Sequence, residues 1–433
     1  MRSEGNLIKS IDWLTVGFYT IFVFFGWLNI YAAVYDPEAY ISPFSGSSRA
    51  GQQLMWIGLS SITILMIMVV DYKFYNSFAF VLYGIVIFLL LATFVLAPDI
   101  KGSRSWLVLG PIRLQPAEFA KFATALVLAR YLGDINVKFN QIKTRLVIGA
   151  IIGLPAIIII AQNETGTMLV LAAFVIVLYR EGLSPYILVF GILSIALFVM
   201  TLMFDKYYLM GALGILAFFI LGVILLELRK KNARKRPVYQ KAFIVAGVYA
   251  LCVGVIFSVN FFVNDVLQPH QQNRIKALID PESDIKGIGW NLYQSKVAIG
   301  SGELTGKGFL KGTQTKFDFV PEQSTDFIFC TIGEEYGWIG SSVFILFYVI
   351  FICRLVNLAE RQKDRFSRIY GYSVASIFFF HFMVNIGMTI GVFPIIGIPL
   401  PFISYGGSSL LGFTILLFVF LKLDAHRKQQ LWH

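Results

Sequence analysis

Apolar runs recur along the whole 433-residue chain, and most are about 18 to 25 residues long, enough to cross a hydrocarbon core about 30 Å thick as a helix. A hydrophobic fraction of 57% with only 14% charged residues excludes an ordinary soluble domain. Closed β-barrels are excluded because their strands alternate in much shorter segments. The sequence therefore predicts an all-α, polytopic integral membrane bundle of twelve helices, over residues 12–34, 53–70, 75–97, 116–132, 145–162, 165–180, 184–204, 207–227, 243–264, 327–355, 369–393 and 406–424.

Lysine and arginine collect in alternate connections between these runs, as they do in cytoplasmic loops. Residues 228–241 hold seven basic residues and no acid, and residues 354–368 add five more. The connection at 133–145 and the C-terminal tail share their parity, which predicts that both termini are cytoplasmic. Because these loops account for most of the formal net charge of +11, that charge does not indicate a nucleic-acid partner.

The polar stretch at residues 265–325 falls on the opposite side and is predicted to be one large extracytoplasmic loop. The loop at about 98–115 and the short break at 162–164 open toward the same side. The stretch 393–409, with three prolines and three glycines, interrupts the spans there as well, and such backbone normally lines protein or water rather than lipid. We expect any chemistry at this face, with residues 393–409 closing the roof of a cavity.

Asp326 stands where the large loop becomes an apolar helix. We expect Thr325 to cap that helix and Asp326 to occupy its first turn, near the positive end of the helix dipole. An acid at a helix start is often only structural. An ionised carboxylate at the membrane surface can also accept a proton from a hydroxyl or hold a divalent cation. The residues alone leave both interpretations open.

A second charged pair opens the helix that begins at Pro116, whose missing N–H suits the first helical position. Glu118 and Lys121 are three residues apart and share a face, so they can pair, which makes an intramembrane charge tolerable. Two interpretations stay open. The pair is either a structural salt bridge that locks this helix to its neighbour or a pair that lines a substrate cavity.

The histidines and cysteines show no metal-binding spacing. His381 lies on an apolar run and is interpreted as a hydrogen-bonded helix-packing residue. The three cysteines, at positions 252, 330 and 353, are interpreted as small core residues.

Glu164 interrupts an apolar stretch, and a lone carboxylate there is costly, so we expect a partner. A lysine of the large loop, or a divalent cation shared with Asp326, are the candidates. The glycine-rich segment 300–312 matches no Walker or dinucleotide motif. It interleaves flexible backbone with Lys307 and Lys311, close to Lys296, and this composition suits a phosphate or pyrophosphate cradle. Loop flexibility explains the glycines equally well.

Several motifs together resemble the SEDS family of shape, elongation, division and sporulation proteins, and the elongation members more than the division members. They are Gln115-Pro-Ala-Glu-Phe-Ala-Lys121, Asp280-Pro-Glu-Ser-Asp284, Gln294-Ser-Lys-Val-Ala-Ile-Gly-Ser-Gly302, Gly306-Lys-Gly308, Gly312-Thr-Gln314, Thr325-Asp-Phe-Ile-Phe329, Val384-Asn-Ile-Gly-Met388 and Pro399-Leu-Pro-Phe-Ile-Ser-Tyr-Gly-Gly407. The resemblance covers most of the chain as a single membrane domain over residues 1–433.

This resemblance implies a peptidoglycan glycosyltransferase of the bacterial cytoplasmic membrane that polymerises lipid II and works in cell elongation and shape. It implies a class B penicillin-binding protein and other elongation-complex membrane proteins as partners. The family's essential aspartate falls on Asp326, and its helix-start pair falls on Glu118 and Lys121. Arg104 and Trp106 fall in the family's outer-loop motif.

Two departures from the family pattern are visible. The family commonly has Gln-Pro-Asp where this chain has Gln162-Asn-Glu164, which puts a metal or phosphate role of Glu164 in doubt. The family has ten spans, so the two extra spans are predicted to be an inserted helix pair near 184–227. An even insertion keeps the large loop on the outer side.

The resemblance predicts an inverting transfer in which Asp326 is the general base for the acceptor hydroxyl. Lys296, Lys307 and Arg104 would neutralise the pyrophosphate of an undecaprenyl-pyrophosphate-linked glycan donor. A Mg²⁺ or Mn²⁺ ion held by Glu164 and Asp326 would add to this charge. Two other classes of function are open: a lipid II flippase, which needs a polar site near mid-bilayer, and a non-catalytic scaffold.

Overall fold

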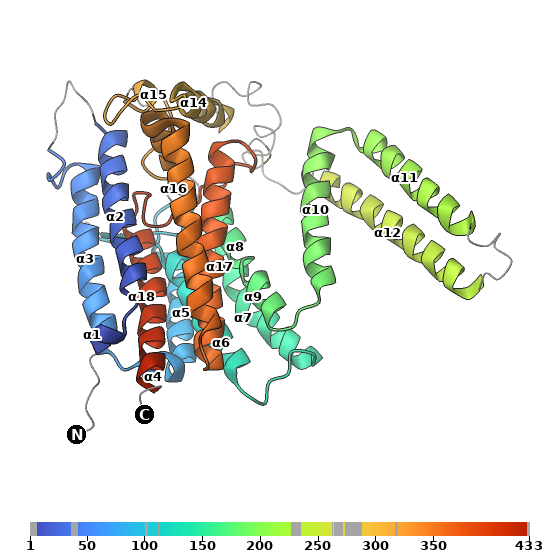
Figure 1. Cartoon of the computed structure of the whole chain (residues 1–433), viewed down its shortest axis with the longest axis horizontal. Coiled ribbons are helices and arrows are strands. Elements are labelled where there is room, and N and C mark those ends of the chain that lie inside the picture. The colour runs from blue at the N-terminus through green and yellow to red at the C-terminus, as the bar shows by residue number, and fades with distance from the viewer. Residues whose placement is uncertain are drawn as a thin grey trace. The chain divides into compact units, whose positions relative to one another are not determined.

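The described part of the chain folds mostly into helices (Figure 1). A computed structural model describes residues 7–35, 42–99, 103–110, 112–226, 235–261, 263, 272, 288–316 and 319–430. Its elements are α1 (Leu7–Ser10), α2 (Trp13–Ala33), α3 (Arg49–Val69), α4 (Tyr72–Ser77), α5 (Ala79–Leu96), β1 (Leu107–Leu109), β2 (Ile112–Leu114), α6 (Pro116–Gly133), α7 (Ile142–Ala161), α8 (Thr165–Leu171), α9 (Phe174–Arg180), α10 (Pro185–Met203), α11 (Lys206–Leu226), α12 (Lys235–Phe261), α14 (Ile288–Ser301), α15 (Thr313–Lys316), α16 (Ile328–Glu360), α17 (Arg365–Thr389) and α18 (Gly407–Gln430). The predicted all-α class is confirmed.

The chain divides into two compact units. The larger unit, called the main bundle here, comprises residues 1–183 and 291–433. The smaller unit is residues 184–290, in which α12 packs against both α10 and α11. The predicted inserted pair at 184–227 covers α10 and α11, whereas the smaller unit also includes α12. The Asp280–Asp284 motif and the basic residues at 228–234 lie outside the described residues.

Within the described ranges, nine helices are long and apolar enough to cross a membrane: α2, α3, α5, α7, α11, α12, α16, α17 and α18. The other three predicted spans correspond to α6, to α8 and α9 together, and to α10. The apolar stretches Thr165–Arg180 and Pro185–Thr201 are shorter, and α6 carries three charged residues, Glu118, Lys121 and Arg130. A membrane protein is therefore clear from the helices, while the count of twelve stays a prediction.

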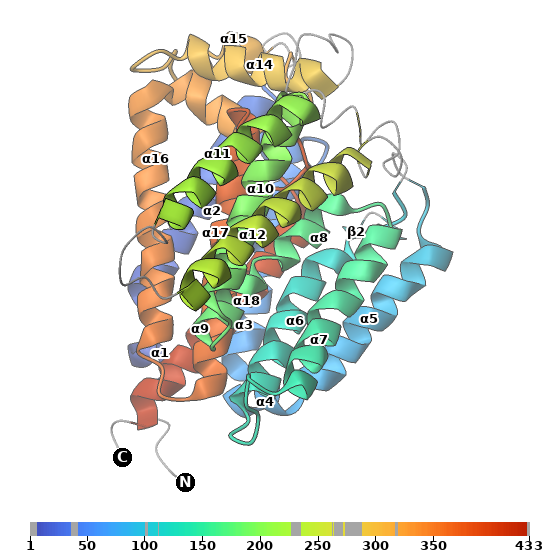
Figure 2. The same cartoon turned by 90° about the vertical axis from the view of Figure 1, so that its right-hand side faces the viewer.

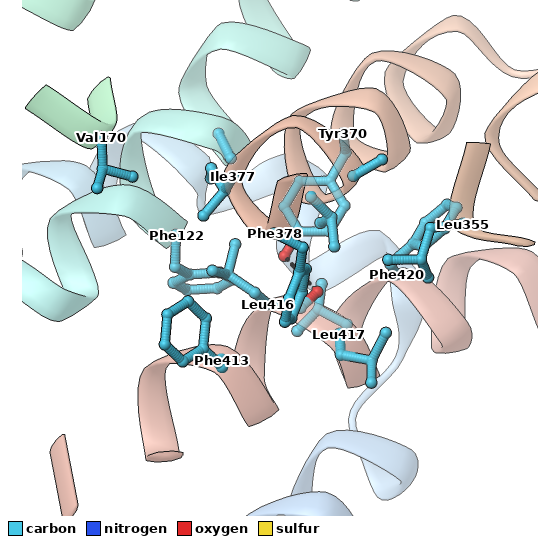
Figure 3. Close-up of a cluster of buried hydrophobic side chains, with 14 of the residues drawn as sticks. Phe122, Val170, Leu355, Tyr370, Ile377, Phe378, Phe413, Leu416, Leu417 and Phe420 are labelled. Carbon is cyan, nitrogen blue, oxygen red and sulfur yellow. Dashed lines mark hydrogen bonds between the residues drawn. The ribbon is translucent and has the colours of Figure 1, made fainter. Parts of the chain in front are cut away.

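Helices α17 and α18 form the centre of the main bundle, since most of their residues are buried. Figure 3 shows the packed core, which joins α6, α8, α16, α17 and α18 through Phe122, Val170, Leu355, Tyr370, Ile377, Phe378, Phe413, Leu416, Leu417 and Phe420. Gly371 brings α17 close to its neighbours, because a Cβ there would lie 2.4 Å from the Phe420 ring. Small residues serve this purpose in membrane helix packing, where dispersion contacts replace the hydrophobic driving force.

The cysteine prediction is only partly correct. Cys330 is buried, as a core residue should be, and Cys252 is half-buried. Cys353 is exposed on the outer surface of α16, so interpreting it as a core residue is wrong. In an apolar span, sequence hydrophobicity does not distinguish a face toward lipid from a face toward protein.

The loop predicted at about 98–115 contains a short antiparallel hairpin that the sequence did not indicate. Strand β1 pairs with β2 in the register Leu107 with Leu114 and Val108 with Arg113. The hairpin leads into α6, and its backbone is tied to α18, because the Ser408 hydroxyl donates to the Arg113 carbonyl at 3.1 Å. The hairpin thus holds its side chains at the end of the main bundle where α6 begins.

Helices α14 and α15 lie across one end of the main bundle, away from α1 and α4 (Figures 1 and 2). Residues 302–316, called the strap, follow α14 and include α15. The strap runs against a kink in α16 at Gly337, where φ is +65°. The kink needs glycine, because a Cβ on Gly337 would lie 2.3 Å from the Gly306 nitrogen. The Lys307 amide then donates to the Glu334 carbonyl at 3.0 Å, which joins strap and kink through their backbones.

The Glu334 carboxylate of α16 holds the strap in place through hydrogen bonds. Its Oε1 accepts hydrogen bonds from the Lys307 ammonium at 2.7 Å and from the Thr313 and Gln314 amides at 2.7 and 2.9 Å. Its Oε2 accepts from the Thr315 amide at 3.0 Å and hydroxyl at 2.9 Å. The start of α15 thus forms an anion site of backbone N–H groups, and the protein's own carboxylate fills it.

Replacing Glu334 by glutamine should loosen the strap. The glutamine amide has one acceptor oxygen, whereas the donors around Glu334 now use both carboxylate oxygens. Losing hydrogen bonds to a charged group costs about 3 kcal/mol. Amide hydrogen exchange over residues 302–316 should then be roughly 100-fold faster, while exchange in α17 and α18 is unchanged. Glu303→Gln is the matched control, since Glu303 lies in the same strap and is exposed. Wild-type exchange rates in Glu334→Gln would contradict the prediction.

Candidate active site

Two loops meet at the end of the main bundle that α14 and α15 cover: residues 320–327 before α16 and residues 390–406 between α17 and α18. The Tyr405 amide donates to the Ser324 carbonyl at 2.8 Å, and the Ser404 hydroxyl donates to the Thr325 carbonyl at 2.6 Å. The role of 393–409 as the roof of a cavity stays a prediction. This segment packs directly on the segment that carries Asp326.

Thr325 and Asp326 lie before α16 rather than in its first turn. The helix begins at Ile328, and its N-cap Phe327 makes no side-chain capping bond. The Thr325 hydroxyl instead donates to the Glu322 carbonyl at 3.1 Å. The predicted Thr325 cap is therefore wrong, because the turn at Glu322 offers the hydroxyl a nearer acceptor. Asp326 consequently occupies an irregular turn and is half-buried.

The Asp326 carboxylate lies against Gly397 of the facing loop. A Cβ on Gly397, where φ is +75°, would come within 3.2 Å of the Asp326 Oδ2. Asn385 of α17 ties the two segments together: its Nδ2 donates to the Asp326 carbonyl at 2.8 Å and to the Ile398 carbonyl at 2.7 Å. The carboxylate thus rests against loop backbone at Gly397, and its own segment is held by Asn385.

Two arginines that the sequence analysis did not select lie beside this segment. Arg49 donates to the Ser324 hydroxyl at 2.5 Å, and its guanidinium carbon lies 5.9 Å from the centre of the Tyr405 ring. Burial raises the pKa of the Tyr405 hydroxyl, and the charges of Arg49 and Arg113 partly offset that rise. Arg49 could have been found from topology, because it is a basic residue in a connection predicted to be external, where such residues are depleted.

Glu164 has partners other than those expected. Its Oε1 accepts hydrogen bonds from the Ser103 hydroxyl at 3.0 Å and from the Ser105 hydroxyl at 2.5 Å. These serines, rather than a lysine of the large loop, satisfy the carboxylate, because the chain before the hairpin crosses the start of α8. The two serines flank Arg104, so Glu164 binds the side chains on either side of it.

Arg104 and Trp106 remain at the surface of this hairpin segment. The Arg104 side chain is 59% exposed, and its Nε lies 4.0 Å from Asp99 Oδ2, which is a weak, solvated ion pair. Trp106 is half-buried. A guanidinium with this exposure is available to an anionic ligand.

The lysines of the large loop are separated by the structure. Lys307 is engaged by Glu334, as described above, whereas Lys296 is exposed on α14. Lys296 lies beside Gly391 at the end of α17: a Cβ on that glycine would come within 2.7 Å of the ammonium nitrogen. The predicted phosphate cradle in the glycine-rich segment is thus occupied by an internal carboxylate, and Lys296 is the more accessible cation.

Glu118 and Lys121 are sealed inside the main bundle. The Lys121 ammonium is fully buried, lies 2.7 Å from Glu118 Oε2 and also contacts His381. His381 is buried and hydrogen-bonded between helices, which confirms its interpretation as a packing residue. The pair therefore has the geometry of the structural interpretation.

In the described part of the chain, no group of three or more histidine, cysteine, aspartate or glutamate side chains is placed to hold a metal ion. Glu164 Oε1 accepts hydrogen bonds from two serine hydroxyls, and its share in a cation site with Asp326 stays a prediction. Mg²⁺ often binds through one or two carboxylates together with substrate phosphates. A divalent cation at Asp326 therefore stays a prediction.

Known proteins share both sequence and fold with this chain. Residues 12–212 and 238–429 match the FtsW/RodA/SpoVE family, described as cell cycle proteins. The peptidoglycan glycosyltransferase MrdB of Escherichia coli K12 is 30% identical over 373 residues, covering 86% of this chain and 84% of that protein. The peptidoglycan glycosyltransferase RodA of Treponema pallidum is 28% identical over 451 aligned residues, covering 99% and 100%.

Solved structures show the same fold. A chain from a study titled for the coordination of polymerization and crosslinking by a peptidoglycan synthase complex has a TM-score of 0.69 and 22% identity, with 97% of this chain and 99% of that chain covered. RodA of Thermus thermophilus has a TM-score of 0.60 and 20% identity, with 96% and 97% covered. The chain therefore belongs to the FtsW/RodA/SpoVE family of cell cycle proteins, the SEDS family that its motifs indicated.

Proposed function

We propose that this chain is a peptidoglycan glycosyltransferase that polymerises lipid II on the outer face of the bacterial cytoplasmic membrane, in cell elongation and shape. The names of its relatives support the activity: MrdB of Escherichia coli and RodA of Treponema pallidum are both named peptidoglycan glycosyltransferases. The observation that carries the proposal is the carboxylate of Asp326, which rests against Gly397 of the facing loop at one end of the bundle, while Arg49 binds Ser324 two residues earlier in the same segment.

The reaction is a single displacement with inversion. The C4 hydroxyl oxygen of an incoming lipid II attacks the anomeric carbon of the lipid-linked glycan, Asp326 accepts the hydroxyl proton, and the bond from the anomeric carbon to the pyrophosphate oxygen breaks. Negative charge then develops on the leaving pyrophosphate. Arg49, Arg113, Arg104 and Lys296 are exposed cations that would neutralise it. A divalent cation at Asp326 would supply further neutralisation.

The distribution of charge supports an orientation with both termini in the cytoplasm. Arg354, Arg361, Arg365 and Arg368 lie in and beside the connection from α16 to α17, at the end where α1 and α4 lie. Several of them pair with acids, as Arg365 does with Glu181 at 3.1 Å, yet the basic residues remain in excess. By the positive-inside rule this end faces the cytoplasm and the Asp326 end faces outward.

A class B penicillin-binding protein is the proposed partner, together with other membrane proteins of the elongation complex. The fold shared with a chain of a complex that polymerises and crosslinks peptidoglycan supports this assignment. Polymerisation of lipid II by the purified chain, with and without the cognate transpeptidase, tests the dependence directly. Polymerisation in detergent, with no membrane to flip across, also separates this function from that of a flippase.

Asp326→Asn should abolish polymerisation while leaving the fold and lipid II binding intact. The amide keeps the shape of the side chain but cannot accept the proton, and general-base catalysis contributes about 100-fold or more. The rate of glycan formation by purified protein in detergent measures the loss, with a lipid II binding assay alongside. Asp134→Asn, an exposed acid after α6, is the matched control. Full activity of Asp326→Asn would overturn both the proposed mechanism and the assignment of the site.

Replacing Arg49 or Arg113 by glutamine should lower kcat/KM for lipid II by about 10- to 100-fold, because each removes a cation near the developing pyrophosphate charge. Arg49→Lys should recover part of the rate, since it restores the charge without the planar hydrogen-bonding fork. Lys73→Gln, an exposed residue of α4, provides the control for a general change in net charge. Unchanged kinetics in both glutamine variants would exclude these arginines from the site.

A further inference from the structure

The Asp326 carboxylate rests against a short backbone segment within the stretch 393–409. This segment, residues 396–400, is called the floor here. Gly397 of the floor lies between two elements: the Asp326 carboxylate on one side and Gly166 of α8 on the other. A Cβ on Gly166 would lie 2.9 Å from the Ile396 carbonyl oxygen and 3.1 Å from that of Gly397. Because Gly397 and Gly166 have no side chains, the floor packs closely against the Asp326 carboxylate and against α8. A shift of the floor would therefore move the surface against which the carboxylate rests.

Three consecutive floor residues each have one backbone polar group held by a side chain. Asn385 donates to the Ile398 carbonyl at 2.7 Å, and the His381 Nδ1 lies 3.0 Å from the Pro399 carbonyl. The Leu400 amide donates to the Ser404 hydroxyl at 2.8 Å.

Two of these side chains also hold the segment that carries Asp326. Asn385 binds the Asp326 carbonyl, and the Ser404 hydroxyl donates to the Thr325 carbonyl. His381 and Asn385 are four residues apart on α17, so they project from one face of the helix.

The charged pair behind His381 determines how that ring can bond. The Lys121 ammonium lies 3.0 Å from His381 Nε2, and an ammonium group only donates, so Nε2 accepts and the ring proton lies on Nδ1. That proton is then donated to the Pro399 carbonyl, which can only accept. Glu118 compensates the Lys121 charge at 2.7 Å. Lys121 and His381 are 0% and 1% exposed, so neither side chain has surface to offer a substrate.

We propose that His381, Asn385 and Ser404 are positioning residues for Asp326, and that the buried pair Glu118–Lys121 acts on the reaction through His381 rather than by binding substrate. This inference rests on the proposed function. The pair holds the imidazole in one tautomer, the imidazole and Asn385 hold the floor, and the floor holds the carboxylate at its distance from the acceptor hydroxyl. Positioning of this kind affects the chemical step, since a displacement of about 1 Å can cost about 100-fold in rate.

Two substitutions of His381 separate the contacts of its two nitrogens. The Asn side-chain nitrogen falls near the place of Nδ1, so His381→Asn can still donate to the Pro399 carbonyl. The longer Gln side chain reaches the place of Nε2, so His381→Gln can accept from Lys121 but leaves Pro399 without its donor. We expect kcat for lipid II polymerisation to fall by about 30- to 100-fold in His381→Gln, with KM unchanged, and by only about 3-fold in His381→Asn.

A second pair of variants tests the floor where the bundle interior is not disturbed. Ser404→Ala removes the acceptor of the Leu400 amide and the donor to the Thr325 carbonyl, and should lower kcat by about 10-fold without changing KM. Ser404→Thr keeps the hydroxyl and should restore most of the rate. Thermal unfolding in detergent, measured for all four variants, shows whether a loss of kcat merely follows a loss of folded protein.

The outcomes distinguish this inference from the proposed function. If wild type polymerises lipid II and Asp326→Asn does not, the function stands whatever the His381 and Ser404 variants do. Equal kcat in His381→Gln and His381→Asn, or an increase in KM with kcat preserved, would then overturn the positioning role alone. A wild-type protein that forms no glycan, with or without a transpeptidase, would overturn the function itself.

Discussion

The placement of Asp326 depends on a constraint that the bilayer imposes on backbone. A polar N–H or carbonyl group near membrane depth has little water to bond, so irregular chain must find partners inside the protein. The turns on either side of Asp326 cannot satisfy themselves as helices do. Asn385 and Ser404 supply the missing bonds to both turns at once, so the two loops fold as one piece. The position of the carboxylate follows from that joint requirement.

The same constraint governs the charges. Lys121 inside the bundle is matched by Glu118, and Glu334 beneath the strap is matched by Lys307 and the amides that open α15. A buried ion without such partners would cost several kcal/mol. Charges that are compensated in this way stabilise the fold. Arg49, Arg113 and Lys296 are exposed at the same end. Under the proposed function they neutralise the pyrophosphate of the donor.

Much of the fold could be predicted from the sequence, because each of those predictions rested on neighbouring residues. Long apolar runs became helices, and the Thr325-Asp326 motif lies directly before an apolar helix, close to where it was predicted. The errors arose where a distant residue competes for a local group. The Thr325 hydroxyl turned back to Glu322 instead of capping α16. The glycine-rich strap has the composition of a phosphate cradle, yet its amides bind Glu334, which lies in an apolar helix many residues later and showed no local signal.

The sequence by itself determined that this chain is a helical membrane protein, which family it belongs to and which aspartate to examine, because hydropathy and motifs are carried by neighbouring residues. Only the tertiary structure decided what surrounds that aspartate. The contact of Asp326 with Gly397, the bonds of His381 and Asn385 to the floor and the approach of Arg49 join residues from separate helices. Such contacts are set by how the helices pack, and no spacing along the chain records them.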